Sequence, residues 1–131
     1  MIERVDHIGI AVRNADEAAA RYALLGLAPA GSEIVRTEGV RIAFLDVGGT
    51  RIELLEPTDD TGPVAKFLRD RGEGVHHVAF GVRDIEAAMS EASARGFRVV
   101  DERPRTGHGG RKVAFIHPRS AHGVLLEFVQ E

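Results

Sequence analysis

An internal repeat restricts the fold of this chain more than any other feature. Aligned with itself at an offset of 70 residues, the chain places the segment HIGIAVRN, which begins at His7, on HVAFGVRD, which begins at His77. The helix-like segments that follow also match, and they end at Gly26 and Gly96. Because such repeats mark duplicated structural units, we expect two copies of one small unit.

Each copy opens with a strand pattern in which apolar residues alternate along the segment. The bulky apolar positions are Ile8, Ile10 and Val12 in the first copy and Val78, Phe80 and Val82 in the second. His7 and His77 fall on the opposite face, together with glycine and alanine, since side chains alternate across a strand. Both histidines therefore share a face with small residues that leave room beside them.

A helix pattern follows each of these strands. Asn14 and Asp84 are candidate N-caps, and Gly26 and Gly96 are candidate helix ends. The stripes expected to face inward are Ala15, Ala18, Ala19 and Tyr22 in the first copy and Ile85, Ala88, Met89 and Ala92 in the second.

Three strand-like segments then complete each copy. They are SEIVRTE, VRIAFLDV and TRIELLE in the first copy and FRVVDERP, KVAFIH and GVLLEFVQ in the second. The sequence therefore predicts an α+β fold of one domain, built from two tandem βαβββ modules at about 1–57 and 75–131. A linker between them contains a short helix at about 63–71.

Four polar residues recur in register on this duplicated pattern. Glu53 and Glu127 each lie in the last strand of a copy with apolar residues on both sides, where a buried acid needs a partner. With His7 and His77 they form a set of two histidines and two carboxylates. The chain has no cysteine, so this set is the natural place for a divalent metal such as Zn, Ni, Co, Mn or Fe.

The overall composition excludes several kinds of partner. The chain has 131 residues and a formal net charge of −3, with its cations spread along the sequence, so we expect no nucleic acid partner. No apolar run approaches the ~20 residues that a membrane span needs. The N-terminal segment lacks a signal-peptide core, which favours a soluble cytoplasmic protein.

Several segments resemble the vicinal oxygen chelate superfamily (glyoxalase, bleomycin resistance and dioxygenase proteins) and, within it, the methylmalonyl-CoA epimerases. They are DHIGIAV, GVRIAFLDVGGTRIELLEP, VAKFL, GEGVHHVAFGV, and FIHP followed by GVLLEF. DHIGIAV is typical of the whole superfamily. More specific to the epimerases is the combination of ELLEP, a short helical linker and GVHHVAF. The resemblance implies a glyoxalase-like curved mixed β-sheet around a metal site.

The resemblance also implies a function and a site. His7, Glu53, His77 and Glu127 would hold one divalent ion, Co²⁺ in the first place, with Mn²⁺, Ni²⁺ or Zn²⁺ as alternatives. The substrate would be an acyl-CoA, methylmalonyl-CoA, whose R and S forms interconvert by proton abstraction at C2 through a metal-stabilised enolate. The acyl-chain preference, methylmalonyl or ethylmalonyl, and a homodimer are left open.

The acid–base groups are less completely defined. The resemblance points to Glu127 as ligand and base, but a glutamate that some epimerases carry on the strand after GV is replaced here by Ile42. Glu53 is the substitute that the pseudo-symmetry favours, with a metal-bound water or a histidine at the rim as alternatives.

A glycine-rich loop, RPRTGHGGRK, offers contacts for the coenzyme A tail. Its candidate substrate-binding residues are Gly109, Gly110, Arg111 and Lys112, because glycine lets backbone N–H groups approach a phosphate and the cations suit its charge.

Three other functions remain compatible with the same sequence. Glyoxalase I, a lactoylglutathione lyase, uses the same ligand types. A non-haem iron oxygenase needs only two histidines and one carboxylate. A non-enzymatic binding or resistance protein of this superfamily would need no complete ligand set.

Overall fold

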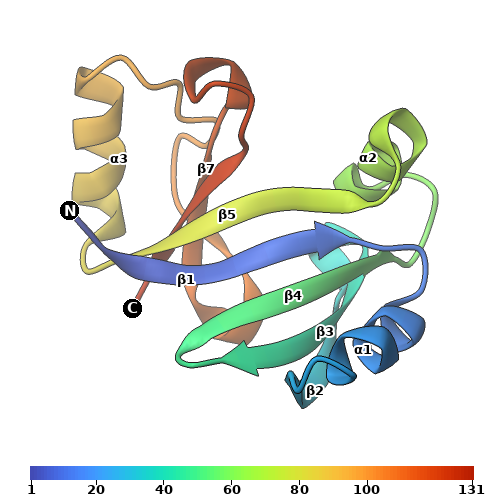
Figure 1. The fold of residues 1–131 in the computed structure, drawn as a ribbon. Helices are drawn as coiled ribbons and strands as arrows, with labels where there is room; N and C mark the ends of the chain where they lie inside the picture. The colour runs from blue at the N-terminus through green and yellow to red at the C-terminus, as the bar shows by residue number, and fades with distance from the viewer. The chain divides into compact units, whose positions relative to one another are not determined.

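The computed structural model describes all residues 1–131. Its eight strands follow the order β2-β3-β4-β1-β5-β8-β7-β6 in one mixed sheet, and three α-helices complete the chain (Figure 1). The chain divides into two compact units, one formed by residues 7–76 and the other by residues 1–6 with 77–131. The first strand, β1 (Ile2–Ala11), contributes to both.

The unit of residues 7–76 contains most of the first predicted module. Its remaining elements are α1 (Ala15–Ala23), β2 (Ala28–Val35), β3 (Val40–Val47), β4 (Thr50–Pro57) and α2 (Pro63–Arg71). β1 pairs with β4 in parallel, while β2, β3 and β4 pair in antiparallel fashion. α2 occupies the range predicted for a helix, with Pro63 at its first turn.

A two-residue turn joins β3 to β4. Val47 pairs with Thr50, and both Gly48 and Gly49 have positive φ angles, 54° and 93°. Such a turn requires left-handed backbone at both positions, and its twist matches that of the flanking strands. The turn therefore fixes the pairing of β3 with β4.

The two faces of this unit differ. One face packs on α1: Ala15 is fully buried, and Ala18, Ala19 and Tyr22 pack on the same cluster, as the helix pattern predicted. The opposite face carries His7 and Glu53 and, further along, an apolar cluster in contact with Phe67 and Leu68 of α2. The buried members of that cluster are Ala11, Val40, Ile42, Phe44, Leu55 and Val64.

The second unit repeats this arrangement. It contains β5 (Gly74–Val82, from His77 onward), α3 (Ile85–Ala94), β6 (Arg105–Thr106), β7 (Lys112–Ile116) and β8 (Leu126–Gln130). β5 pairs with β8 in parallel, and β8 pairs with β7 in antiparallel fashion. Figure 1 shows α3 alongside the strands of this unit, and its buried face is the predicted stripe of Ile85, Ala88, Met89 and Ala92.

The helix ends form as the sequence predicted. The side chains of Asn14 and Asp84 accept hydrogen bonds from the backbone N–H groups three residues later, at 2.9 and 3.1 Å. After α3, the N–H of Gly96 donates to the carbonyl of Ser93 and that of Phe97 to the carbonyl of Ala92. This pair of bonds is a Schellman motif, and it requires the φ of 93° that Gly96 adopts.

One predicted strand is wrong, and others are displaced. The segment at 97–104 forms only an isolated bridge, Val99 with Ile116, and the short β6 follows it. The carboxylate of Asp101 accepts the N–H of Phe115 at 2.9 Å, so a side chain replaces the backbone acceptor that a longer strand would supply. The segment predicted at 32–38 lies in β2 only to Val35, and residues 36–38 form a 3₁₀ turn. β8 begins at Leu126, three residues later than predicted.

No helix of the chain is long and apolar enough to span a membrane.

Candidate metal centre

The first half of the candidate site is a buried histidine–glutamate pair in the unit of residues 7–76. β1 supplies His7 and the neighbouring β4 supplies Glu53, whose backbone pairs with Gly9. The His7 Nδ1 lies 3.4 Å from the Glu53 Oε2, and each side chain is only 7% exposed.

The second half is an equivalent pair in the other unit. β5 supplies His77 and β8 supplies Glu127, whose backbone pairs with Ala79. The His77 Nε2 lies 3.3 Å from the Glu127 Oε1, and both side chains are 7% exposed. The edge of the Phe115 ring contacts the imidazole of His77 at a centroid distance of 6.1 Å.

Both pairs follow the same rule of construction. In each unit the small residue two positions after the histidine, Gly9 or Ala79, pairs with the glutamate. The antiparallel neighbour of the glutamate is a phenylalanine in both cases, Phe44 for Glu53 and Phe115 for Glu127. The 70-residue repeat seen in the sequence is therefore also a repeat of the site geometry.

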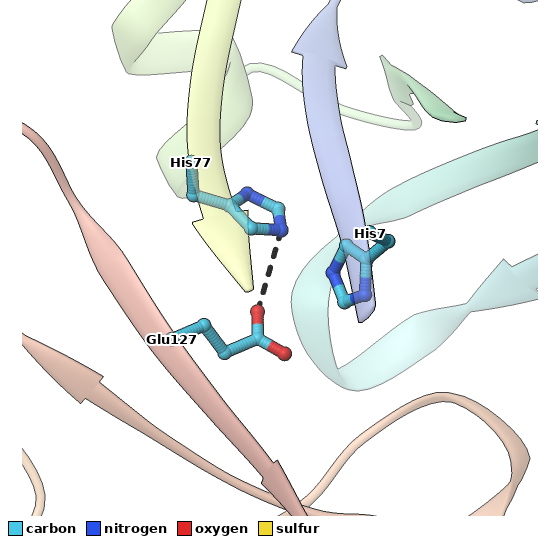
Figure 2. Close-up of side chains that lie close together, drawn as sticks. All are labelled: His7, His77 and Glu127. Atoms are coloured by element: carbon cyan, nitrogen blue, oxygen red, sulfur yellow. Dashed lines mark ion pairs between the residues drawn. The ribbon is translucent and has the colours of Figure 1, made fainter. Parts of the chain in front are cut away.

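Three of the four predicted ligands form a potential metal-binding group. His7, His77 and Glu127 each offer one ligand atom, a ring nitrogen or a carboxylate oxygen, and all three residues are buried (Figure 2). Figure 2 marks the ion pair between His77 and Glu127 within the second unit. Glu53 is not a member of this group of three, but it is paired with one of its members, His7.

The chemistry of these donors fits a divalent cation. Imidazole nitrogen and carboxylate oxygen together suit borderline transition metals, whereas Ca²⁺ and Mg²⁺ prefer oxygen alone. Buried carboxylates are costly without a positive partner. All four residues are buried, with 5–6% of each whole residue exposed, so a cation bound by these side chains would be largely shielded from water.

The other sequence predictions fall at different places. Ile42, which the sequence resemblance matched to a glutamate of some epimerases, is buried in the apolar cluster of β3 and β4. His76 lies on the opposite side of its strand from His77, with its ring against Phe67. Burial lowers the pKa of His76 below its ordinary value, and the charge of Arg71 lowers it further.

The predicted substrate-binding loop contains a 3₁₀ turn at His108–Gly110, in which Gly109 and Gly110 have φ angles of 68° and 75°. Lys112 is exposed. The Arg111 guanidinium donates to Asp6 at 2.9 and 3.3 Å and to the Gln130 carbonyl at 3.2 Å. Its charge is thus engaged within the protein, and contact of this loop with a substrate stays a prediction.

Sequence reasoning missed the role of Asp6. This residue is 6% exposed and accepts hydrogen bonds from Arg4 and Arg111. Arg111 is 105 residues away in the sequence, so no local pattern could have indicated the pair. An acid directly before the first predicted histidine is the only signal, and it does not distinguish a buried ion pair from an exposed side chain.

Comparison with known proteins identifies the family. Residues 6–115 match the Glyoxalase/Bleomycin resistance protein/Dioxygenase superfamily. The chain belongs to this superfamily. The fold that the sequence resemblance implied is thus that of a member of the glyoxalase superfamily.

Relatives within the glyoxalase superfamily match over the whole chain. The ethylmalonyl-CoA/methylmalonyl-CoA epimerase of Cereibacter sphaeroides is 36% identical, over 99% of this chain and 99% of its own. A methylmalonyl-CoA epimerase solved in complex with methylmalonyl-CoA and NH₄⁺ is 38% identical, with a TM-score of 0.95 over 100% of this chain and 96% of its own. A hypothetical protein from Bacillus halodurans is 44% identical, with a TM-score of 0.94 over 98% of this chain and 94% of its own.

Proposed function

We propose that this protein is a metal-dependent epimerase that interconverts (R)- and (S)-methylmalonyl-CoA. The observation that carries the proposal is the pair of buried histidine–glutamate sets, His7 with Glu53 and His77 with Glu127. Relatives that are named epimerases for this substrate match the chain from end to end, and one was solved with methylmalonyl-CoA bound.

In this proposal the four side chains hold a single divalent ion. His7, His77 and Glu127 would supply three ligand atoms, and Glu53 would supply the fourth from beside His7. Such an ion is a Lewis acid that stabilises negative charge developing on the thioester oxygen. Co²⁺ is the first candidate, and Mn²⁺, Ni²⁺ and Zn²⁺ suit the same donors.

Epimerisation needs one proton removed at C2 and one returned on the other face. Glu127 is our candidate for the first group. Its carboxylate lies beside His77, with Oε1 3.3 Å from the His77 Nε2, and a carboxylate can accept a proton from carbon. Burial of the carboxylate excludes bulk water, which would otherwise compete for that proton.

The second group is Glu53 in this proposal. Ile42 has no proton to exchange and lies among apolar side chains, so the position used by a glutamate in some epimerases is chemically inert here. Glu53 lies on the same sheet face, because its neighbour Phe44 and Ile42 are two residues apart on β3. It is also the counterpart of Glu127 in the repeat.

The decisive experiment measures exchange of the C2 proton of methylmalonyl-CoA in D₂O, using protein reconstituted with Co²⁺, Mn²⁺, Ni²⁺ or Zn²⁺ in turn. We expect deuterium incorporation and conversion of one epimer into the other only with metal present. The parallel assay is formation of lactoylglutathione from methylglyoxal and glutathione. Activity in this assay without exchange at C2 would identify a glyoxalase I instead.

Two further measurements distinguish the epimerase from an iron oxygenase and from a non-enzymatic binding protein. Oxygen uptake that depends on iron would indicate an oxygenase. Purified protein that binds no metal and gains no activity from it would indicate a binding protein of the same superfamily.

A further inference from the structure

We propose that Arg51 binds the free carboxylate of the substrate's acyl group and thereby selects malonyl-type thioesters over neutral acyl thioesters. The inference rests on the proposed function, since it concerns the substrate of the same site. Three features of the unit formed by residues 7–76 support it: the position of Arg51, its orientation, and its weakly compensated charge.

The position of Arg51 is next to two predicted metal ligands. On β4 it precedes Glu53 by two residues, so the two side chains share a face of the sheet. Its backbone is the parallel neighbour of His7 on β1. A cation on this face, beside His7 and Glu53, is placed to contact an anionic group of a substrate bound at the proposed site.

An aromatic ring holds the guanidinium in place. The Arg51 Cζ lies 5.1 Å from the centroid of the Phe44 ring, and Phe44 is the antiparallel neighbour of Glu53. Stacking of this kind orients the planar guanidinium while its N–H groups remain directed outward in the plane. Such an arrangement suits two parallel hydrogen bonds to a carboxylate.

The charge of Arg51 is weakly compensated by the protein. Its nearest carboxylate, Asp46, lies 3.5 Å away and is 59% exposed, and the Arg51 side chain itself is 43% exposed. Exposed pairs at this separation contribute little and exchange readily with solvent or ligand.

The other unit provides a contrast. Arg105 also lies 5.1 Å from a phenylalanine centroid, that of Phe115, but it forms a 2.8 Å pair with Asp101, which is only 11% exposed. The residue two positions before Glu127 is Leu125, so this strand carries no cation beside its glutamate. Only one of the two repeated half-sites therefore presents a cation from the strand of its glutamate.

The chemistry of the substrate indicates which anion Arg51 would bind. Methylmalonyl-CoA carries negative charge at the acyl carboxylate and at the nucleotide phosphates, and the pantetheine arm separates the two. A residue beside two metal ligands is close to the reacting acyl end. At that end Arg51 would donate hydrogen bonds to the acyl carboxylate.

The test compares two ligands that differ by this carboxylate, methylmalonyl-CoA and propionyl-CoA. Calorimetric titration of the metal-loaded protein gives both affinities, for the wild type and for Arg51→Gln. We expect the variant to bind methylmalonyl-CoA about tenfold more weakly, because it loses one hydrogen-bonded contact to a charged group. Its affinity for propionyl-CoA should not change. Arg51→Lys should recover part of the lost affinity, because lysine keeps the positive charge but cannot form two parallel hydrogen bonds to a carboxylate.

Arg41→Gln is the matched control. Arg41 lies on β3, where it pairs with Asp16 of α1 at 2.7 Å on the opposite face of the same sheet. The Arg41→Gln substitution removes the same charge and should change the affinity for neither methylmalonyl-CoA nor propionyl-CoA. An equal loss for both thioesters in Arg51→Gln would place the contact on the coenzyme A portion and overturn the proposal, as would no loss at all.

The two proposals fail separately. Suppose that the wild type prefers methylmalonyl-CoA and exchanges the C2 proton of this substrate, and that Arg51→Gln keeps the full preference. This result would contradict only the role of Arg51. A wild-type protein without C2 exchange contradicts the epimerase function itself.

Discussion

At the scale of single residues, the site combines ordinary side chains whose roles depend on what surrounds them. Glu127 and Glu131 lie on or just beyond the same strand, yet Glu127 is 5% exposed beside His77, whereas the Glu131 side chain is 40% exposed and pairs with Arg4. Only the first is shielded from water, as the proposed proton transfer requires. The two acids therefore form a natural pair of test positions.

Glu127→Gln should lower kcat for methylmalonyl-CoA by about 10²–10⁴-fold, because an amide cannot take up the proton of C2. The near-isosteric change should leave the circular dichroism spectrum and the thermal midpoint close to those of the wild type. Glu131→Gln is the control and should retain wild-type turnover. A Glu127→Gln variant with the wild-type rate and wild-type metal content would refute the assignment of the base.

Glu53→Gln separates the two roles proposed for that residue. An amide oxygen can still coordinate a divalent ion, but it cannot transfer a proton at neutral pH. We expect near-stoichiometric metal by elemental analysis together with a large loss of C2 proton exchange. Full activity in a metal-loaded Glu53→Gln variant would mean that another group supplies the second proton.

At the scale of elements, helix ends and turns determine where the functional strands begin and end. Gly96 ends α3 with a φ of 93°, and no atom lies within 4 Å of where its Cβ would be. The cost of a side chain there is thus one of backbone conformation and not of collision. Asp59 has a comparable role before α2, where its carboxylate accepts hydrogen bonds from the N–H and hydroxyl of Thr61, both at 2.8 Å.

Gly96→Ala should lower the free energy of unfolding by about 1 kcal/mol, because alanine is disfavoured in left-handed backbone. Gly74→Ala at the start of β5 is the control, since Gly74 has ordinary backbone and equally open surroundings. Urea denaturation of both variants measures the difference. Equal stability of the two variants would contradict this account of the helix end.

The turn at Asp59 predicts a pH dependence. The hydrogen bonds from Thr61 lower the pKa of Asp59 below its ordinary value of 3.8. The stability contributed by this carboxylate is therefore complete above the unfolded pKa and is lost as the pH falls through the lower folded pKa. We expect Asp59→Asn to be less stable than wild type near neutral pH, with the difference shrinking in acid. Urea denaturation of both proteins from pH 7 to pH 3 measures this difference, and a difference that stays constant over the range would contradict the account.

At the scale of the whole molecule, much of the architecture could be predicted because the chain repeats itself. Offset alignment identified both histidines, and the caps at Asn14 and Asp84 located the helices. The strand at 97–104 could not be predicted correctly, because the Asp101 carboxylate takes the N–H of Phe115, which is distant in sequence. The ion pair of Asp6 with Arg111 could not be predicted either, because its two partners are also distant in sequence. The module limits at 1–57 and 75–131 stay a prediction.

Metal binding should stabilise the whole chain if all four side chains hold one ion. A ligand that binds only the folded state adds about 2.7 kcal/mol when its concentration is 100 times its Kd. We expect Co²⁺ to raise the thermal midpoint of the wild type, and His7→Ala and His77→Ala each to remove most of that rise. If Co²⁺ raised the thermal midpoint of either variant as much as that of the wild type, this would contradict the proposal that both repeats share a single metal site.

The two-glycine turn between β3 and β4 has a consequence for how this sequence can change in evolution. Because Val47 pairs with Thr50, the turn length determines that Glu53 shares a face with Phe44. With the turn kept at two residues, inserting one amino acid before Glu53 would move its carboxylate to the α1 side and away from His7. Insertions and deletions within this ladder should therefore be tolerated in pairs of residues, so hairpin lengths among functional relatives should differ mainly by even numbers.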